Sequence, residues 1–192
     1  MTAPLKIAIT GTHSTGKSTF LDALETRLTG HGLTVGRIGE LAVKARDLGF
    51  PILAGHTIES TLWIMAEGLR REAEMSLTCD VILVDRPILD PLGYLQAALE
   101  VSGRIVAAHR LDQLRAIARA HVGDYGLLLM TVLDPEIPLG EGRDGDLAYR
   151  QAVGRHIDAL VTAFAPAAQR LSPTNAELLL QRAEALATAG RA

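Results

Sequence analysis

Residues 11–18 read Gly-Thr-His-Ser-Thr-Gly-Lys-Ser. It fits the pattern G-x-x-x-x-G-K-[ST] of a phosphate-binding loop, or P-loop. The apolar run 5–10 before it predicts a short buried strand, and apolar residues recur at helical spacing over residues 17–29 after it. A loop between a strand and the start of a helix is the context in which this pattern binds phosphate.

The residue types in this loop suit a bound triphosphate. Gly11 and Gly16 let the backbone turn and approach the phosphates without a Cβ clash. Backbone N–H groups and the positive end of a helix dipole can replace the water around the phosphates. Lys17 can reach the β- and γ-phosphates, and the Ser18 hydroxyl can bind Mg²⁺. The predicted nucleotide-binding residues are Gly11, Thr12, His13, Ser14, Thr15, Gly16, Lys17, Ser18 and Thr19.

Length and composition predict one globular domain over residues 1–192. The chain is 48% hydrophobic and 21% charged, which suits a sizeable core. No apolar run approaches the length that spans a bilayer, and no signal peptide is evident. The net charge of −3 gives no support to a nucleic-acid surface, and Cys79 has no second cysteine to pair with. We therefore expect a cytoplasmic protein with neither nucleic-acid nor membrane partners.

Strand and helix patterns alternate along the chain. Further strands are predicted at 33–39, 81–85, 127–133 and 167–171, and further helices at 40–48, 57–77, 91–101, 104–121, 147–164 and 174–188. This alternation predicts an α/β domain with a parallel sheet. Ligands in such folds bind at the carboxyl ends of the strands, where Gly11, Glu40, Asp85 and Asp134 gather.

Two charged residues stand at the end of the apolar run 81–85. Asp85 has the position of a Walker-B carboxylate and can hold Mg²⁺ directly or through water. The alternative is a helix N-cap, since turn-like sequence follows. Arg86 has a planar guanidinium that suits a bidentate grip on a phosphate or a polar substrate group. Its alternative is a structural or surface salt bridge.

Glu40 follows the predicted strand 33–39. A carboxylate there can face the γ-phosphate across a pocket and accept a proton from a substrate hydroxyl. This makes Glu40 the candidate general base. The alternative is an acidic residue at a helix start, which the helix dipole favours.

A candidate lid lies further along the chain, at about residues 136–150. The segment 140–146 is rich in Gly and charge, which predicts a mobile loop. Arg143 in this loop is a candidate for closing over the transferring phosphate. Arg150 and Arg155 follow on the predicted helix; they either join the lid or form a solvated face.

Trp63 lies off the apolar stripe of the predicted helix 57–77. It can stack on a planar substrate, pack at a subunit interface, or be partly buried in the ordinary way. The six His residues have neither H-x-x-x-H nor H-E-x-x-H spacing, so the sequence predicts no zinc site.

Three stretches together resemble a known P-loop family. They are the loop 11–18, Glu40 with Arg46 downstream, and the run Asp85-Arg86-Pro-Ile-Leu-Asp90-Pro-Leu-Gly-Tyr94. The family includes the ribosylnicotinamide kinase domain of bacterial NAD-metabolism regulators. The stretch Glu141-Gly142-Arg143-Asp144 resembles its lid. More broadly, the chain is similar to nucleoside and nucleotide kinases.

The resemblance implies a three-layer domain whose five parallel strands have the kinase-type order, with an Arg-bearing lid. It also implies ATP and Mg²⁺ as cofactors and a small-molecule acceptor, and it allows a homodimer with Trp63 at the contact. Carried over to this sequence, the catalytic residues are Lys17, Glu40, Asp85 and Arg143, the metal ligands are Ser18 and Asp85, and the substrate residues are Glu40, Arg46, Trp63, Arg86 and Asp90.

These observations favour an ATP- and Mg²⁺-dependent transfer of the γ-phosphate to a nucleoside, a nucleotide or a related metabolite. Two other functions stay open at this point. An NTPase switch would hydrolyse ATP or GTP and signal to a protein partner; a guanine-reading Asn/Thr-Lys-x-Asp motif would favour it, and the sequence has none. A binding module would retain nucleotide without turnover.

Overall fold

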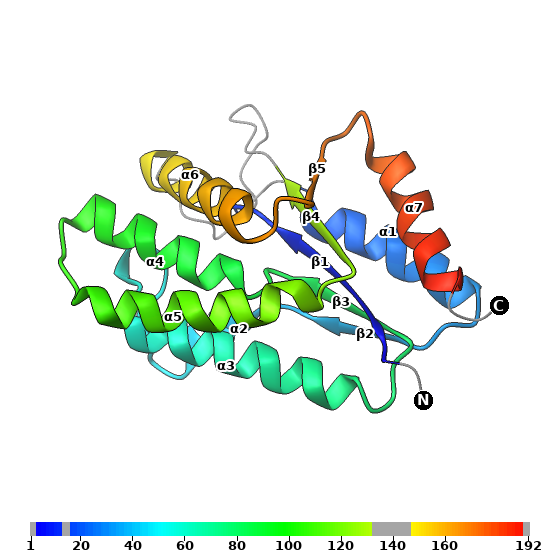
Figure 1. Ribbon diagram of the computed structural model, residues 1–192, viewed down its shortest axis with the longest axis horizontal. Coiled ribbons are helices and arrows are strands. Elements are labelled where there is room, and N and C mark those ends of the chain that lie inside the picture. Colours follow the sequence, from blue (N-terminus) through cyan, green and yellow to red (C-terminus); the bar gives the residue numbers. More distant parts are fainter. Residues whose placement is uncertain (1–2, 13–15, 132–146, 190–192) are drawn as a thin grey trace.

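A computed structural model describes residues 3–12, 16–131 and 147–189 (Figure 1). The strands are Leu5–Thr10 (β1), Val35–Ile38 (β2), Val81–Asp85 (β3), Leu127–Thr131 (β4) and Gln169–Leu171 (β5). The α-helices are Lys17–Gly30 (α1), Leu41–Asp47 (α2), Ile58–Met75 (α3), Leu89–Ser102 (α4), Ala108–His121 (α5), Leu147–Phe164 (α6) and Ala176–Ala189 (α7). Two 3₁₀ turns span Leu53–Gly55 (η1) and Val122–Asp124 (η2).

The strands form one sheet in the order β2-β3-β1-β4-β5, and every neighbouring pair is parallel. This confirms the predicted five-stranded sheet and its kinase-type order. Ile9 of β1 lies opposite Asp85 of β3, and Thr10 lies opposite Met130 of β4. The carboxyl ends of the central strands therefore meet at one edge, on either side of Gly11.

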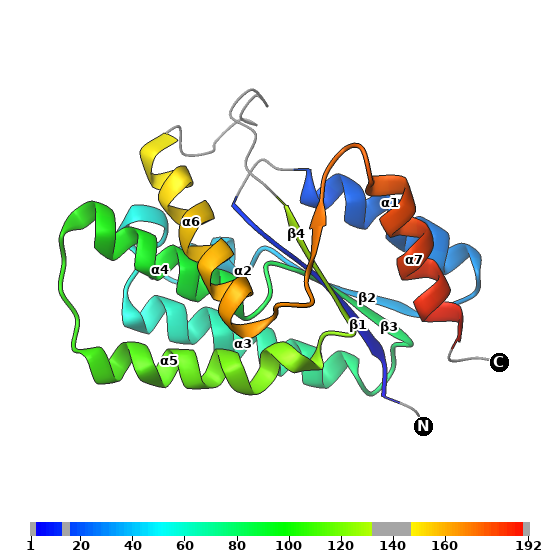
Figure 2. The same ribbon diagram turned by 45° about the horizontal axis from the view of Figure 1, so that its top comes forward.

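Both faces of the sheet are covered, which makes three layers (Figures 1 and 2). Ile7 and Ile9 of β1 pack with α1 and α7 on one face, whereas Ala8 packs with α2 to α6 on the other. Successive side chains on a strand point to opposite faces, so a strand buried on both sides must be apolar throughout. This explains the unbroken apolar residues at 7–9 in β1, 81–84 in β3 and 127–130 in β4.

The helix that follows the P-loop is joined to the last helix by polar contacts. Arg27 of α1 donates to both carboxylate oxygens of Glu177 in α7, at 3.0 and 2.7 Å. His31, just after α1, lies 2.5 Å from the carboxylate of Glu184. These contacts flank the apolar seam between the two helices and fix which faces of α1 and α7 meet.

The element ends differ from the sequence prediction by a few residues. The predicted helix 104–121 begins at Ala108 because α4 continues to Ser102 and Gly103 then ends it with a φ of 68°. The predicted lid, 136–150, falls largely outside the described residues, and only its last residues form the start of α6. None of the described helices is both long and apolar enough to cross a membrane.

Glycines at the contact between α4 and α6 give a test of this packing. A β-carbon on Gly93 of α4 would lie 2.6 Å from Cγ1 of Ile157 in α6, whereas one on Gly154 of α6 would meet nothing within 4 Å. We expect Gly93→Ala to lower the free energy of unfolding by about 1–3 kcal/mol through overpacking. Gly154→Ala should raise it by about 0.5–1 kcal/mol, because alanine favours helix. Urea unfolding of both variants measures this, and equal effects would contradict the packing described here.

Candidate active site

The P-loop leaves the centre of the sheet at Gly11 and enters α1 at Gly16. Both glycines have positive φ, of 132° and 79°, which residues with a side chain rarely adopt. Thr12 is buried, whereas Ser18 and Thr19 in the first turn of α1 are exposed. His13, Ser14 and Thr15 lie outside the described residues. The described ends of the loop thus have the backbone that the motif predicts.

The predicted phosphate-binding lysine lies against its own loop. Lys17 is 5% exposed, and its Nζ donates to the carbonyl oxygens of Gly11, at 3.1 Å, and Thr12. The ammonium group is therefore held against the backbone at the start of the loop, where Gly11 has no side chain.

A hydroxyl and a carboxylate meet next to the loop. Ser18 Oγ lies 3.5 Å from Oδ2 of Asp85, and Oδ1 of Asp85 is buried with no hydrogen-bond partner among the described residues. Hard oxygen ligands of this kind suit Mg²⁺, which is usually bound by one or two protein groups together with water and substrate phosphates. Across the described ranges there is no group of three or more His, Cys, Asp or Glu side chains that could hold a metal ion. The pair Ser18–Asp85 thus fits a magnesium ion shared with a substrate.

Glu40 and Arg86 have strained backbones at the same edge of the sheet. Their φ angles are 57° and 65°, in the left-handed region, and among the described residues only Leu53 joins them as a non-glycine residue with positive φ. Gly39, before Glu40, packs against Asp85, because a β-carbon on it would lie 3.7 Å from the Cβ of Asp85. Glu40, the next residue in the chain, is exposed, and its backbone therefore lies close to Asp85. Left-handed non-glycine residues cost free energy and gather at functional sites.

Arg86 is held by a tyrosine on the next helix. Its Nη1 donates to the hydroxyl of Tyr94 at 2.5 Å, and its guanidinium carbon lies 5.3 Å from the centre of the Tyr94 ring. The backbone N–H of Arg86 donates to Ile9 O at 3.1 Å. The cation is thus fixed beside the end of β1, with the Tyr94 hydroxyl as a hydrogen-bond acceptor.

Asp90, predicted as a substrate residue, is 1% exposed. Its Oδ1 accepts the Thr10 hydroxyl at 2.6 Å and the Gly11 backbone N–H at 3.2 Å. Burial raises the pKa of Asp90 to about 6, while the nearby charges of Arg86 and Lys17 act in the opposite direction. The carboxylate of Asp90 thus contacts the base of the P-loop.

Two of the predicted substrate residues, Arg46 and Trp63, contact neighbours that were not predicted as site residues. Arg46, on the exposed side of α2, pairs with the neighbouring Asp47 at 2.9 Å. Trp63 is half-buried, and its ring centre lies 5.7 Å from that of Phe50. Phe50 is thus a ring partner of Trp63 within the chain, and stacking of Trp63 on a substrate or at a subunit interface stays a prediction.

The arginines of the predicted lid have separate environments. Arg143 lies outside the described residues. Arg150 is buried in α6, so it does not form a solvated face. Arg155 is exposed and pairs with Glu100 of α4 at 2.6 Å.

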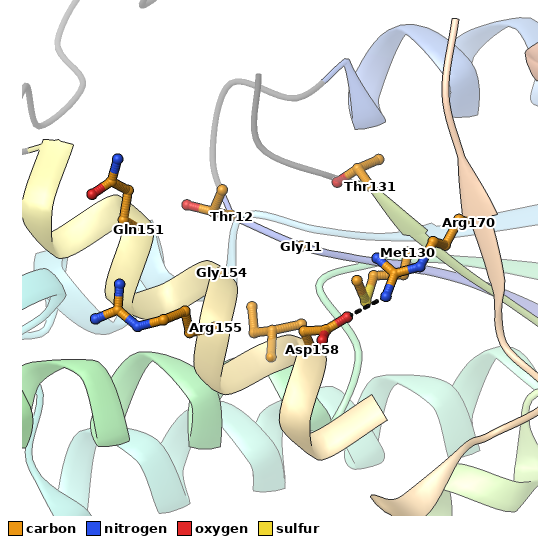
Figure 3. A pocket seen from close by; sticks show the side chains of 10 residues that line it. Gly11, Thr12, Met130, Thr131, Gln151, Gly154, Arg155, Asp158 and Arg170 are labelled. Carbon is orange, nitrogen blue, oxygen red and sulfur yellow. Dashed lines mark hydrogen bonds and ion pairs between the residues drawn. The ribbon is translucent and has the colours of Figure 1, made fainter. Parts of the chain in front are cut away.

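A cavity of about 410 Å³ opens beside the start of the P-loop and the end of β4 (Figure 3). In the strand order, β4 and β3, which ends at Asp85, flank β1 on opposite sides. Gly11 and Thr12 form one wall, Met130 and Thr131 at the end of β4 form the floor, and one face of α6 lies opposite. Its polar lining comes from Gln151, Arg155, Asp158 and Arg170. Arg170 of β5 donates to Asp158 at 2.6 Å, which joins the sheet to α6 across the cavity.

The P-loop therefore separates two halves of one site. Lys17, Ser18 and Asp85 gather at the loop, with Glu40 and Arg86 towards β2 and β3, and the cavity lies towards β4 and β5. Sequence reasoning missed the cavity and the role of Tyr94. Asp90 and Tyr94 are one turn apart on a predicted helix, and this spacing could have predicted that Tyr94 lies on the same helix face as Asp90.

This fold and this edge of the sheet define a P-loop domain of the kinase type. The chain belongs to the AAA domain family AAA_28, whose model matches residues 6–177. No curated protein matches it by sequence.

Solved structures share the fold. A NadR protein in complex with NAD and AMP-PNP aligns with a TM-score of 0.67 at 13% identity, over 97% of this chain and 50% of that one. A NadR complex with NR gives 0.63 at 13% identity, over 88% and 46%. Deoxyadenosine kinase from M. mycoides with bound dATP gives 0.58 at 14% identity, over 93% and 98%. The chain spans about half the length of the NadR chains. These likenesses confirm the P-loop kinase fold.

A buried histidine near this site gives a test of its packing through pH. His56 is 2% exposed, with its ring centre 5.9 Å from that of Tyr94. Burial, together with the charge of Arg104, lowers the pKa of His56 to about 4. The unfolded chain, with a pKa of about 6.5, then binds more protons between these values, so stability falls as the pH drops. We expect His56 to account for a loss of up to roughly 3 kcal/mol between pH 7 and pH 4.

Urea unfolding of the wild type and of His56→Phe at pH 7, 6 and 5 measures this loss. The wild type should lose more stability than His56→Phe as the pH falls, and the exposed variant His109→Phe should follow the wild type. Parallel pH profiles of the wild type and His56→Phe would contradict the assignment.

Proposed function

We propose that this protein is a small-molecule kinase that transfers the γ-phosphate of ATP to a nucleoside, a nucleotide or a related metabolite. The observation that carries the proposal is the pair Ser18–Asp85 at 3.5 Å, with Oδ1 of Asp85 buried and unpartnered among the described residues. It lies beside a P-loop lysine. A phosphate-binding loop and a magnesium-type oxygen pair are the core parts of a phosphoryl-transfer site.

The two halves of the site support separate places for donor and acceptor. The phosphates of ATP would lie on the P-loop, and its base and ribose would enter the cavity towards β4 and β5. Gln151, Asp158 and Arg170 in that cavity offer polar groups to a base or a sugar. The acceptor would then approach from the side of Glu40 and Arg86, at the ends of β2 and β3.

The residues of the chain have distinct roles in this mechanism. Ser18 and Asp85 would hold Mg²⁺, which when bound neutralises charge on the β- and γ-phosphates. Lys17 would release its loop carbonyls and bind the same phosphate oxygens. Glu40 would accept the proton of the acceptor hydroxyl, whose oxygen forms a bond to the γ-phosphorus as the bond to the bridging oxygen of ADP breaks. Arg86 would hold the acceptor, and Arg143 is proposed to approach the transferring group from the lid.

The test is ADP release from ATP and Mg²⁺, with and without a panel of nucleosides, nucleotides and ribosylnicotinamide. We expect one class of acceptor to stimulate release. Acceptor-independent hydrolysis would indicate an NTPase switch instead, and binding without turnover would indicate a nucleotide-binding module. Both results contradict the kinase proposal.

Replacing the lysine tests the P-loop. Lys17→Ala should reduce acceptor-stimulated ADP release about 100-fold or more, because one preorganised positive charge is lost from the phosphates. Lys44→Ala, on the exposed face of α2, is the matched control and should keep wild-type rates.

Replacing the glutamate tests the base. Glu40→Gln keeps the shape of the side chain and removes its proton acceptor, so we expect the rate to fall about 100-fold or more with little change in ATP binding. Glu74→Gln, exposed on α3, is the control. Wild-type rates in a folded Glu40→Gln protein would remove the base assignment.

A further inference from the structure

A buried carboxylate holds the first residue of the P-loop. Asp90, the second residue of α4, accepts the Thr10 hydroxyl at 2.6 Å and the Gly11 backbone N–H at 3.2 Å. Its other oxygen has no hydrogen-bond partner among the described residues. A hydrogen bond from a buried N–H to a carboxylate is stronger than one to a neutral acceptor, so Asp90 fixes the direction in which the chain leaves β1.

Gly11 is also fixed from the opposite side. A β-carbon on it would lie 2.2 Å from Oγ1 of Thr131, and that hydroxyl donates to the Thr10 carbonyl at 3.2 Å. The start of the loop is therefore held between α4 and β4. Its backbone can neither rotate freely nor shift sideways without breaking one of these contacts.

The buried position is costly for a carboxylate. An apolar side chain would avoid this desolvation penalty, but it would leave the Gly11 N–H and the Thr10 hydroxyl without the acceptor that Asp90 gives them. The charge does have a counterpart in Lys17, whose Nζ contacts the carbonyl of the same Gly11. Asp90 thus accepts the hydrogen bond from the Gly11 N–H, and Lys17 donates one to the Gly11 carbonyl.

The same turn of α4 holds the acceptor side. Tyr94, one turn after Asp90, accepts the hydrogen bond from Arg86 at 2.5 Å. Residues four apart on a helix lie on one face. A single rigid turn therefore sets where the P-loop stands relative to the cation at the end of β3.

We propose that Asp90 is a positioning residue for nucleotide: it fixes Thr10 and Gly11 at the base of the P-loop and, through the helical turn shared with Tyr94, aligns the loop with Arg86. The proposal rests on the function proposed above. A loop that is already ordered binds phosphate without an ordering cost, so losing this carboxylate weakens nucleotide binding.

The test is calorimetric titration with MgADP, which gives the dissociation constant and the binding stoichiometry separately. We expect Asp90→Asn to raise the dissociation constant about ten- to a hundredfold at unchanged stoichiometry. A purely structural role would instead lower the stoichiometry, as part of the protein unfolds, while the folded fraction keeps the wild-type dissociation constant. Asp112→Asn, on the exposed side of α5, is the control and should match the wild type.

A second pair of variants keeps the test decisive if Asp90→Asn fails to fold. Thr10→Val removes the hydroxyl that Asp90 accepts, and Thr10→Ser retains it. We expect Thr10→Val to weaken MgADP binding and Thr10→Ser to restore it. Equal dissociation constants for these two variants, or a wild-type constant in folded Asp90→Asn, would overturn the positioning role. Failure of the wild type to bind MgADP would overturn the proposed function as well.

Discussion

The site depends on a position with no room for a side chain, at the point where the central strand ends. A β-carbon on Gly11 would collide with Thr131 on the neighbouring strand. The close approach directs the Gly11 N–H to Asp90 and its carbonyl to Lys17. Because β1 is paired on both edges and covered on both faces, the chain has little freedom before it turns. The loop therefore begins from a fixed backbone. This backbone fixes the positions of the side chains that contact it.

Backbone strain marks the side of the P-loop that faces β2 and β3. Glu40 and Arg86 both adopt left-handed conformations at the ends of adjacent strands. The sequence predicted Glu40 as the general base and Arg86 as a substrate residue. A non-glycine residue in this conformation costs on the order of 1 kcal/mol, and the surrounding packing must hold it in place. The Tyr94 hydroxyl and the carbonyl of Ile9 do this for Arg86.

The fold was largely predictable because its signals are local. Each apolar run, such as 81–85, became a buried strand, and the P-loop pattern located the first strand and helix. The placement of Asp90 was not predictable, because an acidic residue in the first turn of a helix reads equally as a dipole-favoured surface group. Its partners lie 79 and 80 residues away in sequence. The cavity could not be predicted from the sequence either, because β4, β5 and α6, which line it together with the P-loop, are distant from the P-loop in sequence. Arg150, expected either on a solvated face or in the lid, is buried in α6.

The contact between α1 and α7 has a consequence for how the protein is made. Arg27 and Glu177 are 150 residues apart, yet their bond closes the layer that supports the helix behind the P-loop. During synthesis the N-terminal part of a chain leaves the ribosome first, at about 5–20 residues per second. The apolar face of α1 is thus synthesised roughly ten seconds or more before α7, the helix that packs against it. Until α7 has been synthesised, the part of this apolar face that α7 covers in the folded protein stays exposed.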